Sequence, residues 1–191
     1  MSQLLSKQSD ITTEEILSPE KIEKTVESLA AEILKSCDGG GTKNVAFVGI
    51  YTRGVTLANR VAAFLNKSQS LEFPVGTLDI SLYRDDLDSI GSSLPKLESS
   101  DIPFALDDNR VILFDEVIHT GRTIRAALDG LMDYGRPSKV ELAVLVDRGD
   151  REIPVQPDYV GVEVPAKENQ YIQVRFREND GKEGVFLVTE S

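Results

Sequence analysis

The sequence predicts a single α/β domain built on a mostly parallel sheet. Two apolar runs suited to buried strands, at residues 45–50 and 111–114, are each followed by a short turn and by apolar residues at helical spacing. Strands that alternate with helices pair in parallel, because each helix carries the chain back over the sheet. The length of 191 residues fits one domain, and 40% hydrophobic with 28% charged residues is ordinary for a globular chain.

The amino-terminal region predicts a loose segment followed by a helix. Residues 1–17 are polar and lack a periodic pattern, so we expect a flexible N-terminal segment. The dipeptide Ser18-Pro19 is typical of a helix start, with serine as the cap and proline in the first turn. A helix is predicted over residues 19–36, because its apolar residues form one stripe, and three glycines at 39–41 end it.

The middle of the chain predicts another helix, a strand and a long loop. Apolar residues from Val55 to Leu65 recur at helical spacing, and residues 75–82 predict a third strand. The stretch over residues 83–108 is polar and rich in serine, aspartate and proline. A segment of this length inside a compact domain is usually a functional lid or a disordered excursion. Further strands are expected at residues 139–146, 170–176 and 185–188.

The most informative stretch is residues 110–135, RVILFDEVIHTGRTIRAALDGLMDYG. Its strand ends on two adjacent acids, Asp115 and Glu116, and the turn at residues 120–123 then opens a helix. Such a turn presents unpaired backbone N–H groups and the positive end of the helix dipole, which suits a phosphate. Carboxylates at the end of a parallel strand can hold sugar hydroxyls, or Mg²⁺ through its waters. The pattern indicates a phosphorylated sugar, and the alternative is an ordinary turn with a solvated acid pair.

The segment VILFDEVIHTGRT resembles the thirteen-residue 5-phosphoribosyl-1-pyrophosphate (PRPP) signature of the type I phosphoribosyltransferases. Further stretches resemble the PyrR family of pyrimidine regulators with uracil phosphoribosyltransferase activity: VGIYTRGVTLANRV (48–61), VGTLDISLYRDDL (75–87), DGLMDYGRPSKVELAVLVDRGDREIPV (129–155) and DYVGVEVP (158–165). The resemblance implies a type I phosphoribosyltransferase fold over residues 18–191, a mostly parallel sheet flanked by helices. It also implies a small hood subdomain, from about 148–191 plus part of the N-terminal region, and a mobile loop at about 83–108.

The resemblance also implies roles for individual residues. Asp115 and Glu116 would act as catalytic residues that bind the ribose hydroxyls, and Arg84 would contact the pyrophosphate. Substrate-binding residues would come from the pyrophosphate loop, the signature and the hood: Thr52, Arg53, Gly54, Val117, Ile118, His119, Thr120, Gly121, Arg122, Thr123, Arg148 and Ile172. The alternative for Arg53 and Arg84 is that each is a solvated surface charge.

The implied reaction is uracil plus PRPP giving UMP and pyrophosphate, with Mg²⁺ as cofactor. The Mg²⁺ would be held through PRPP and waters near Asp115 and Glu116, without direct protein ligands. Two positions depart from the PyrR pattern, which usually has aspartate at Glu116 and often an aromatic residue such as tyrosine at His119. His119 is the only histidine, and we expect it to offer one hydrogen bond to phosphate and not to act in catalysis.

Charge bears on the expected partners, which are PRPP, uracil and UMP or UTP. The net charge is −11, and the positions that are basic in RNA-binding PyrR members are here Ala31, Asp150, Arg151, Gln156 and Val162. RNA binding depends on cations that neutralise phosphates, so we do not expect this chain to bind RNA as attenuators do. Two alternatives stay open: a UMP/UTP-responsive, RNA-binding attenuator of pyrimidine genes, and a catalytically weak nucleotide sensor. The resemblance also implies a homodimer or higher homo-oligomer.

The sequence predicts a cytoplasmic protein that does not bind to or span a membrane. It has no run of eighteen apolar residues, and its first ten residues lack the apolar core of a signal peptide. Its single cysteine, Cys37, cannot form an internal disulfide, which fits a reducing compartment.

Overall fold

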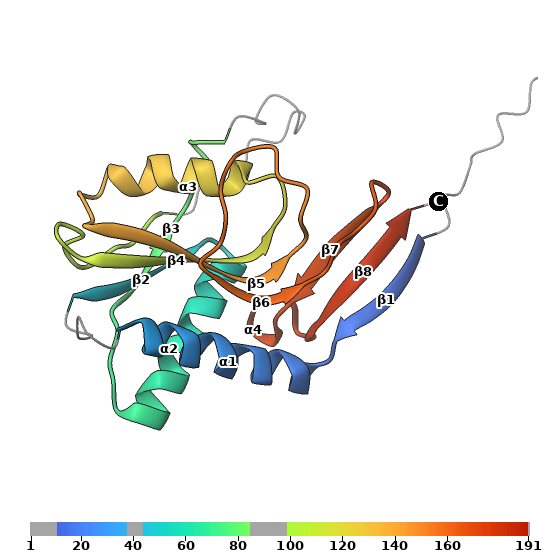
Figure 1. Ribbon diagram of the computed structural model, residues 1–191, viewed down its shortest axis with the longest axis horizontal. Coiled ribbons are helices and arrows are strands. Elements are labelled where there is room, and N and C mark those ends of the chain that lie inside the picture. Colours follow the sequence, from blue (N-terminus) through green and yellow to red (C-terminus); the bar gives the residue numbers. More distant parts are fainter. Residues whose placement is uncertain (1–10, 38–43, 85–98, 191) are drawn as a thin grey trace, which may run out of the picture.

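The computed structural model describes residues 11–37, 44–84 and 99–190, which form two sheets and the helices around them. All neighbouring strands of the central sheet are parallel, which confirms the predicted fold class (Figure 1). In spatial order these strands are β3 (Val75–Leu78), β2 (Val45–Ile50), β4 (Arg110–Ile118), β5 (Lys139–Asp147) and β6 (Tyr159–Glu163).

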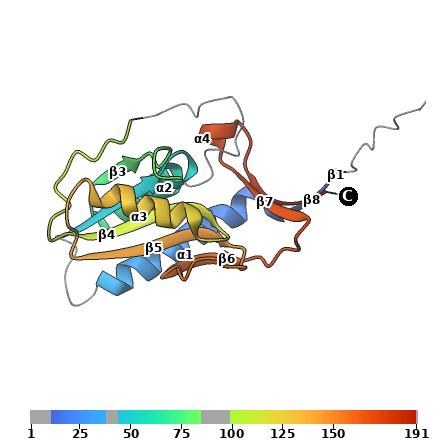
Figure 2. The same cartoon turned by 90° about the horizontal axis from the view of Figure 1, so that it is seen from above.

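Helices cover both faces of the central sheet. α1 (Pro19–Cys37) and α2 (Arg53–Gln69) lie on one face, and α3 (Arg122–Met132) lies on the other (Figures 1 and 2). Side chains along each strand alternate between the two faces, so Phe47 packs in the core beneath α1 and α2 whereas Val48 packs beneath α3. Burial on both faces explains the uninterrupted apolar runs that predicted these strands. No helix in the described ranges is long and apolar enough to cross a membrane.

A second, antiparallel sheet lies beyond the carboxyl ends of the central strands (Figure 1). Its strands, in spatial order, are β1 (Ile11–Leu17), β8 (Gly184–Glu190) and β7 (Gln170–Arg175). A single helical turn, α4 (Arg177–Asp180), connects β7 to β8, and we call this sheet together with α4 the hood.

The expectation that residues 1–17 form a flexible segment is wrong for residues 11–17, because these form β1 and pair with β8. Residues 11–15 are exposed, so their side chains carry no alternating apolar pattern. Backbone hydrogen bonds to β8 hold the strand, and a sequence pattern cannot reveal them. Residues 1–10 lie outside the described part of the chain.

β3 is shorter than the strand predicted over residues 75–82. β3 ends at Leu78, because the next residue, Asp79, folds the chain into a turn. Its Oδ1 accepts hydrogen bonds from the backbone N–H and the hydroxyl of Ser81, at 2.9 and 2.6 Å. An aspartate that bonds two residues ahead is typical of a tight turn.

Part of the predicted mobile loop over residues 83–108 is packed against the sheet. Asp101 forms an antiparallel bridge with Thr77 of β3, and Leu106 is completely buried. The predicted mobile loop therefore includes too many residues at its carboxyl end. There, apolar residues scattered among polar ones pack against the sheet and hold the chain in place. Residues 85–98 lie outside the described ranges.

Candidate active site

A cavity of about 230 Å³ opens at the carboxyl ends of β2, β3 and β4. The predicted site residues that line it are Arg84, Asp115, Glu116, Val117 and Thr123. The acids come from β4, the threonine from the first turn of α3, and the arginine from the segment after β3. Ligands of parallel α/β sheets bind at this edge, so the structure brings the predicted catalytic residues together where a substrate would lie.

Asp79, which was not among the residues predicted from the sequence, also lines the cavity. It directly follows β3, whereas Asp115 and Glu116 lie within the last four residues of β4. The carboxyl ends of parallel strands meet at one edge of the sheet, but the strand predicted over residues 75–82 contains Asp79 and so did not indicate its place at that edge.

Asp115 is a buried acid, only 5% exposed, at the point where β4 meets the cavity. Its Oδ1 accepts the backbone N–H of Glu116 at 3.0 Å. Burial raises the pKa of Asp115 well above its usual value, and the negative charge of Glu116 raises it further, whereas Arg84 opposes the rise. The acid pair therefore favours a positively charged group in the cavity, which would relieve the repulsion.

The turn between β4 and α3 has the geometry of an anion site. α3 begins at Arg122, and Gly121 before it adopts a φ of 90°, a left-handed conformation that glycine adopts without strain. The first N–H groups of a helix have no partner within the helix and attract anions. The carbonyl of Thr120 accepts the N–H groups of Glu152 and Ile153, both at 3.0 Å, so the loop after β5 holds this turn in place.

The turn between β2 and α2 packs directly against the end of β4. A Cβ atom at Gly54 would lie 2.3 Å from the carbonyl oxygen of Phe114, the residue before the acid pair. Only glycine fits this approach, so the predicted loop of Thr52, Arg53 and Gly54 borders the acids, although none of its residues lines the cavity.

Arg53 extends from this turn toward the hood. Its guanidinium donates to both carboxylate oxygens of Asp180 on α4, at 2.5 and 3.1 Å. These hydrogen bonds, and in addition the charge of Glu116, raise the pKa of Arg53, so its cation lies within electrostatic range of Glu116. The structure thus places Arg53 between the cavity and the hood.

Arg148, predicted to face the base, lies under the hood with 7% of its surface exposed. One terminal nitrogen donates to the carbonyls of Lys167 and Gln170, and the other contacts Nε2 of His119. Its Nε is buried and has no hydrogen-bond partner among the described residues. Neither Arg148 nor Ile172, which packs against the core from β7, lines the cavity, so their contact with a ligand stays a prediction.

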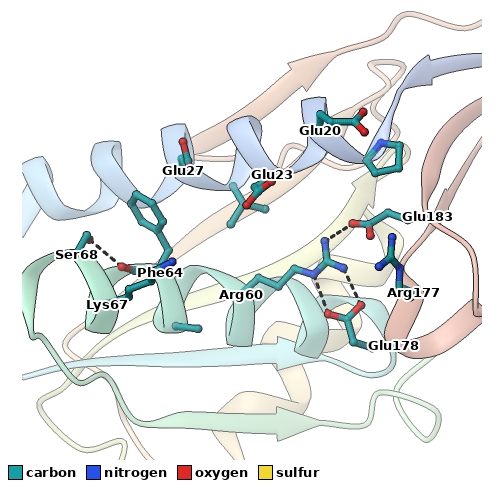
Figure 3. A pocket seen from close by; sticks show the side chains of 13 residues that line it. Glu20, Glu23, Glu27, Arg60, Phe64, Lys67, Ser68, Arg177, Glu178 and Glu183 are labelled. Carbon is teal, nitrogen blue, oxygen red and sulfur yellow. Dashed lines mark hydrogen bonds and ion pairs between the residues drawn. The ribbon is translucent and has the colours of Figure 1, made fainter.

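A larger hollow of about 990 Å³ lies between α1 and α2, beside α4 (Figure 3). Arg60 of α2 crosses it and donates to Glu178 at 2.7 and 2.9 Å, and also to Glu183. The same guanidinium lies 4.7 Å from the ring centre of Phe176. None of the predicted site residues lines this hollow, so its size does not make it the active site.

Comparisons with known proteins find that this chain is similar to phosphoribosyltransferases. The family model described as phosphoribosyl transferase domain matches residues 12–180. A hypoxanthine phosphoribosyltransferase from Staphylococcus aureus superposes with a TM-score of 0.65 at 19% identity, over 91% of this chain and 90% of that one. A hypoxanthine phosphoribosyltransferase from Trypanosoma cruzi gives 0.71 at 17%, over 94% and 96%. At such identities the likeness shows the fold alone, and it confirms the predicted type I phosphoribosyltransferase fold.

Relatives found by sequence are more similar to this chain than these solved structures are, and they indicate which phosphoribosyltransferases it belongs with. The bifunctional protein PyrR of Deinococcus radiodurans is 45% identical over 90% of this chain and 92% of its own length. That of Thermus aquaticus is 45% identical over 91% and 94%, and that of Latilactobacillus sakei is 51% identical over 77% and 83%. The chain belongs to the phosphoribosyltransferase family and, within it, to the PyrR proteins, as its sequence resemblance predicted.

Proposed function

We propose that the protein is a PRPP-dependent uracil phosphoribosyltransferase of PyrR type, which converts uracil and PRPP to UMP and pyrophosphate. The observation that carries the proposal is the cavity in which the buried Asp115 and its neighbour Glu116 adjoin the anion-binding turn before α3. An acid pair beside a phosphate site fits a ribose that carries a 5′-phosphate. The chain's membership in the PyrR family supports uracil as the base.

The residues of the cavity fit Mg²⁺ as the cofactor. Its acids offer oxygen atoms, which Mg²⁺ prefers, but among the described residues no three Asp, Glu, His or Cys side chains cluster closely enough to hold a metal ion. A Mg²⁺ ion would therefore keep substrate oxygens and waters as its main ligands, near Asp115 and Glu116. When bound, it would supply positive charge beside the leaving pyrophosphate.

The protein's own residues would act by positioning and electrostatics. As the bond at ribose C1 breaks, positive charge develops on the sugar, and Asp115 and Glu116 would stabilise it. The first turn of α3 would fix the 5′-phosphate, and Arg84 would neutralise the leaving group. No general base is needed, because the chemistry depends on alignment of the two reactants.

A role as an RNA-binding attenuator has less support. Arg151, the only cation kept at the positions named above, is engaged within the protein. It donates to Asp147 at 2.7 Å and to the backbone carbonyls of His119, Gly149 and Val155 at 2.9 to 3.1 Å. An arginine that uses its donors in this way contributes little to binding phosphates, and the net charge of −11 opposes RNA as well.

The proposed specificity is tested by a panel of bases. The protein is incubated with PRPP, Mg²⁺ and one base at a time: uracil, cytosine, hypoxanthine or orotate. We expect nucleotide and pyrophosphate only with uracil. Faster nucleotide formation from hypoxanthine than from uracil would overturn the assignment of the base.

Tyr83, the residue before Arg84, packs against α3, and this contact yields a prediction. A Cβ atom at Gly130 would lie 2.9 Å from the tyrosine ring, and the tyrosine hydroxyl donates to Asp133 at 2.5 Å. We expect Tyr83→Ala to raise the KM for PRPP about tenfold, because Arg84 loses its fixed position. Steady-state kinetics with varied PRPP would measure the change. Tyr134→Ala, which removes an exposed tyrosine just after α3, is the control, and equal KM values for the two variants would contradict the prediction.

A further inference from the structure

One arginine joins the hood to the turn that borders the phosphate site. Arg148 follows β5, and one of its terminal nitrogens donates to the carbonyls of Lys167 at 3.1 Å and Gln170 at 2.9 Å. Gln170 is the first residue of β7, a strand of the hood. The other terminal nitrogen contacts Nε2 of His119, which follows β4 in the turn before α3. A single buried guanidinium therefore contacts both the start of the hood strand β7 and the turn before α3.

The chemistry of this contact fixes the state of the imidazole. An arginine guanidinium stays protonated and can only donate hydrogen bonds. Nε2 of His119 must therefore accept, which requires a neutral ring with its proton on Nδ1. A protonated ring would place two donors and two positive charges against each other.

The backbone of the turn is fixed independently of this side chain. The N–H of Arg148 donates to the carbonyl of Ile118 at 2.9 Å, and the guanidinium of Arg151 donates to the carbonyl of His119, also at 2.9 Å. Loss of the imidazole would therefore release the guanidinium of Arg148 without releasing the turn itself.

We propose that His119 is a positioning residue whose neutral imidazole orients Arg148 and so links the phosphate turn to the hood strand β7. The inference rests on the proposed function and deepens it, because it assigns His119 to the base-binding half of the site and not to the chemical step. A displaced Arg148 would free the carbonyls of Lys167 and Gln170 and loosen the start of β7. The effect is therefore expected in the KM for uracil more than in kcat.

The surroundings of His119 favour the neutral ring. Burial lowers the pKa of His119 below its usual value of 6.5, and the positive charges of Arg148 and Arg151 lower it further. The charges of Asp150 and Glu152 raise it and are outweighed. The link therefore holds at neutral pH and breaks as the pH falls through the lowered pKa of His119, where the KM for uracil should rise.

An NMR titration tests the contact directly, because His119 is the only histidine and its ring gives a single set of signals. We expect the Nδ1–H tautomer in the wild type, and a pKa that rises toward 6.5 in Arg148→Gln. Arg136→Gln, which alters an exposed arginine after α3, should leave the titration unchanged. An Nε2–H tautomer, or a pKa that Arg148→Gln does not raise, would overturn the inference.

Kinetics then test the consequence for the base. His119→Gln keeps a neutral acceptor, whereas His119→Leu removes it. We expect the KM for uracil to rise about tenfold in His119→Leu and much less in His119→Gln, with smaller changes in kcat and in the KM for PRPP. Only the wild type should show the rise of KM at acid pH.

The proposed function and the proposed role of His119 can be disproved separately. A wild type that forms UMP, with folded His119→Leu at an unchanged KM for uracil, would overturn the inference and leave the proposed function intact. A wild type that forms no UMP would overturn the proposed function, and the NMR titration would then decide by itself whether His119 orients Arg148. Should His119→Leu fail to fold, the acid rise of KM in the wild type and its absence in His119→Gln give the same decision.

Discussion

Replacement of Asp115 with asparagine is expected to abolish UMP formation and, at the same time, to raise the melting temperature. The loss of activity, about 10²-fold or more, follows because a neutral amide cannot stabilise the positive charge that develops on the sugar. The gain in stability follows because the buried carboxylate of Asp115 lies beside Glu116, and the amide removes that repulsion without changing the volume. A gain of 1 kcal/mol corresponds to about 2–4 °C in a chain of this size.

The pH dependence of this effect has a definite sign. The pKa of Asp115 is raised in the folded state above its ordinary value of 3.8, so the folded protein binds this proton more tightly than the unfolded chain does. Wild-type stability is therefore lost, relative to Asp115→Asn, as the pH rises from about 4 through the folded pKa. Melting curves of both proteins from pH 4 to pH 8 should diverge with rising pH. Asp101→Asn, at an exposed position, is the control, and a lower melting temperature for Asp115→Asn at pH 8 would contradict the account.

Replacement of Gly54 with alanine is expected to unfold part of the population and to remove activity. The new Cβ atom would lie 2.3 Å from the backbone carbonyl of Phe114, which cannot move away as a flexible side chain could. The start of α2 must then shift from the end of β4, and overpacking of this kind costs about 1–3 kcal/mol. The shift also separates the turn that carries Arg53 from the acid pair, so the protein that still folds should bind PRPP poorly.

Urea unfolding and PRPP kinetics measure the two effects of Gly54→Ala. Asn59→Ala, at an exposed position on the same helix, introduces the same side chain without a clash and should leave the free energy of unfolding within about 0.5 kcal/mol of wild type. If Gly54→Ala were as stable as Asn59→Ala, the close packing of α2 on β4 would not contribute as described.

The periodicity of apolar residues predicted the helices that bury one face and the strands that are buried on both faces. β4, which the sequence predicted only as far as Phe114 and which continues to Ile118, and the helix after Gly121 follow the apolar pattern, because their side chains fill the two cores of the sheet. The acid pair and the glycine turn were also visible, since their spacing is set within one strand–turn–helix unit. Local chemistry at contiguous positions is what a single sequence shows best.

Features that depend on distant partners were not predictable. β1 is held by backbone pairing with β8, and the pair of Arg53 with Asp180 joins positions that are far apart in the chain. The burial of Arg148 under the hood likewise depends on carbonyls that follow β6. Asp79 is a different case, because the apolar pattern predicted a strand over residues 75–82 that contains it, whereas β3 ends at Leu78, directly before it.

The central claim is that the acid pair and the phosphate turn form the active site of a uracil phosphoribosyltransferase. The most direct test is a time course of UMP and pyrophosphate formation by the wild-type protein from uracil, PRPP and Mg²⁺. The account predicts that both products appear in equal amounts, that the reaction requires Mg²⁺, and that Asp115→Asn forms neither. A folded wild type that PRPP or UMP protects against heat, but that forms no UMP, would contradict the claim and indicate a nucleotide sensor instead.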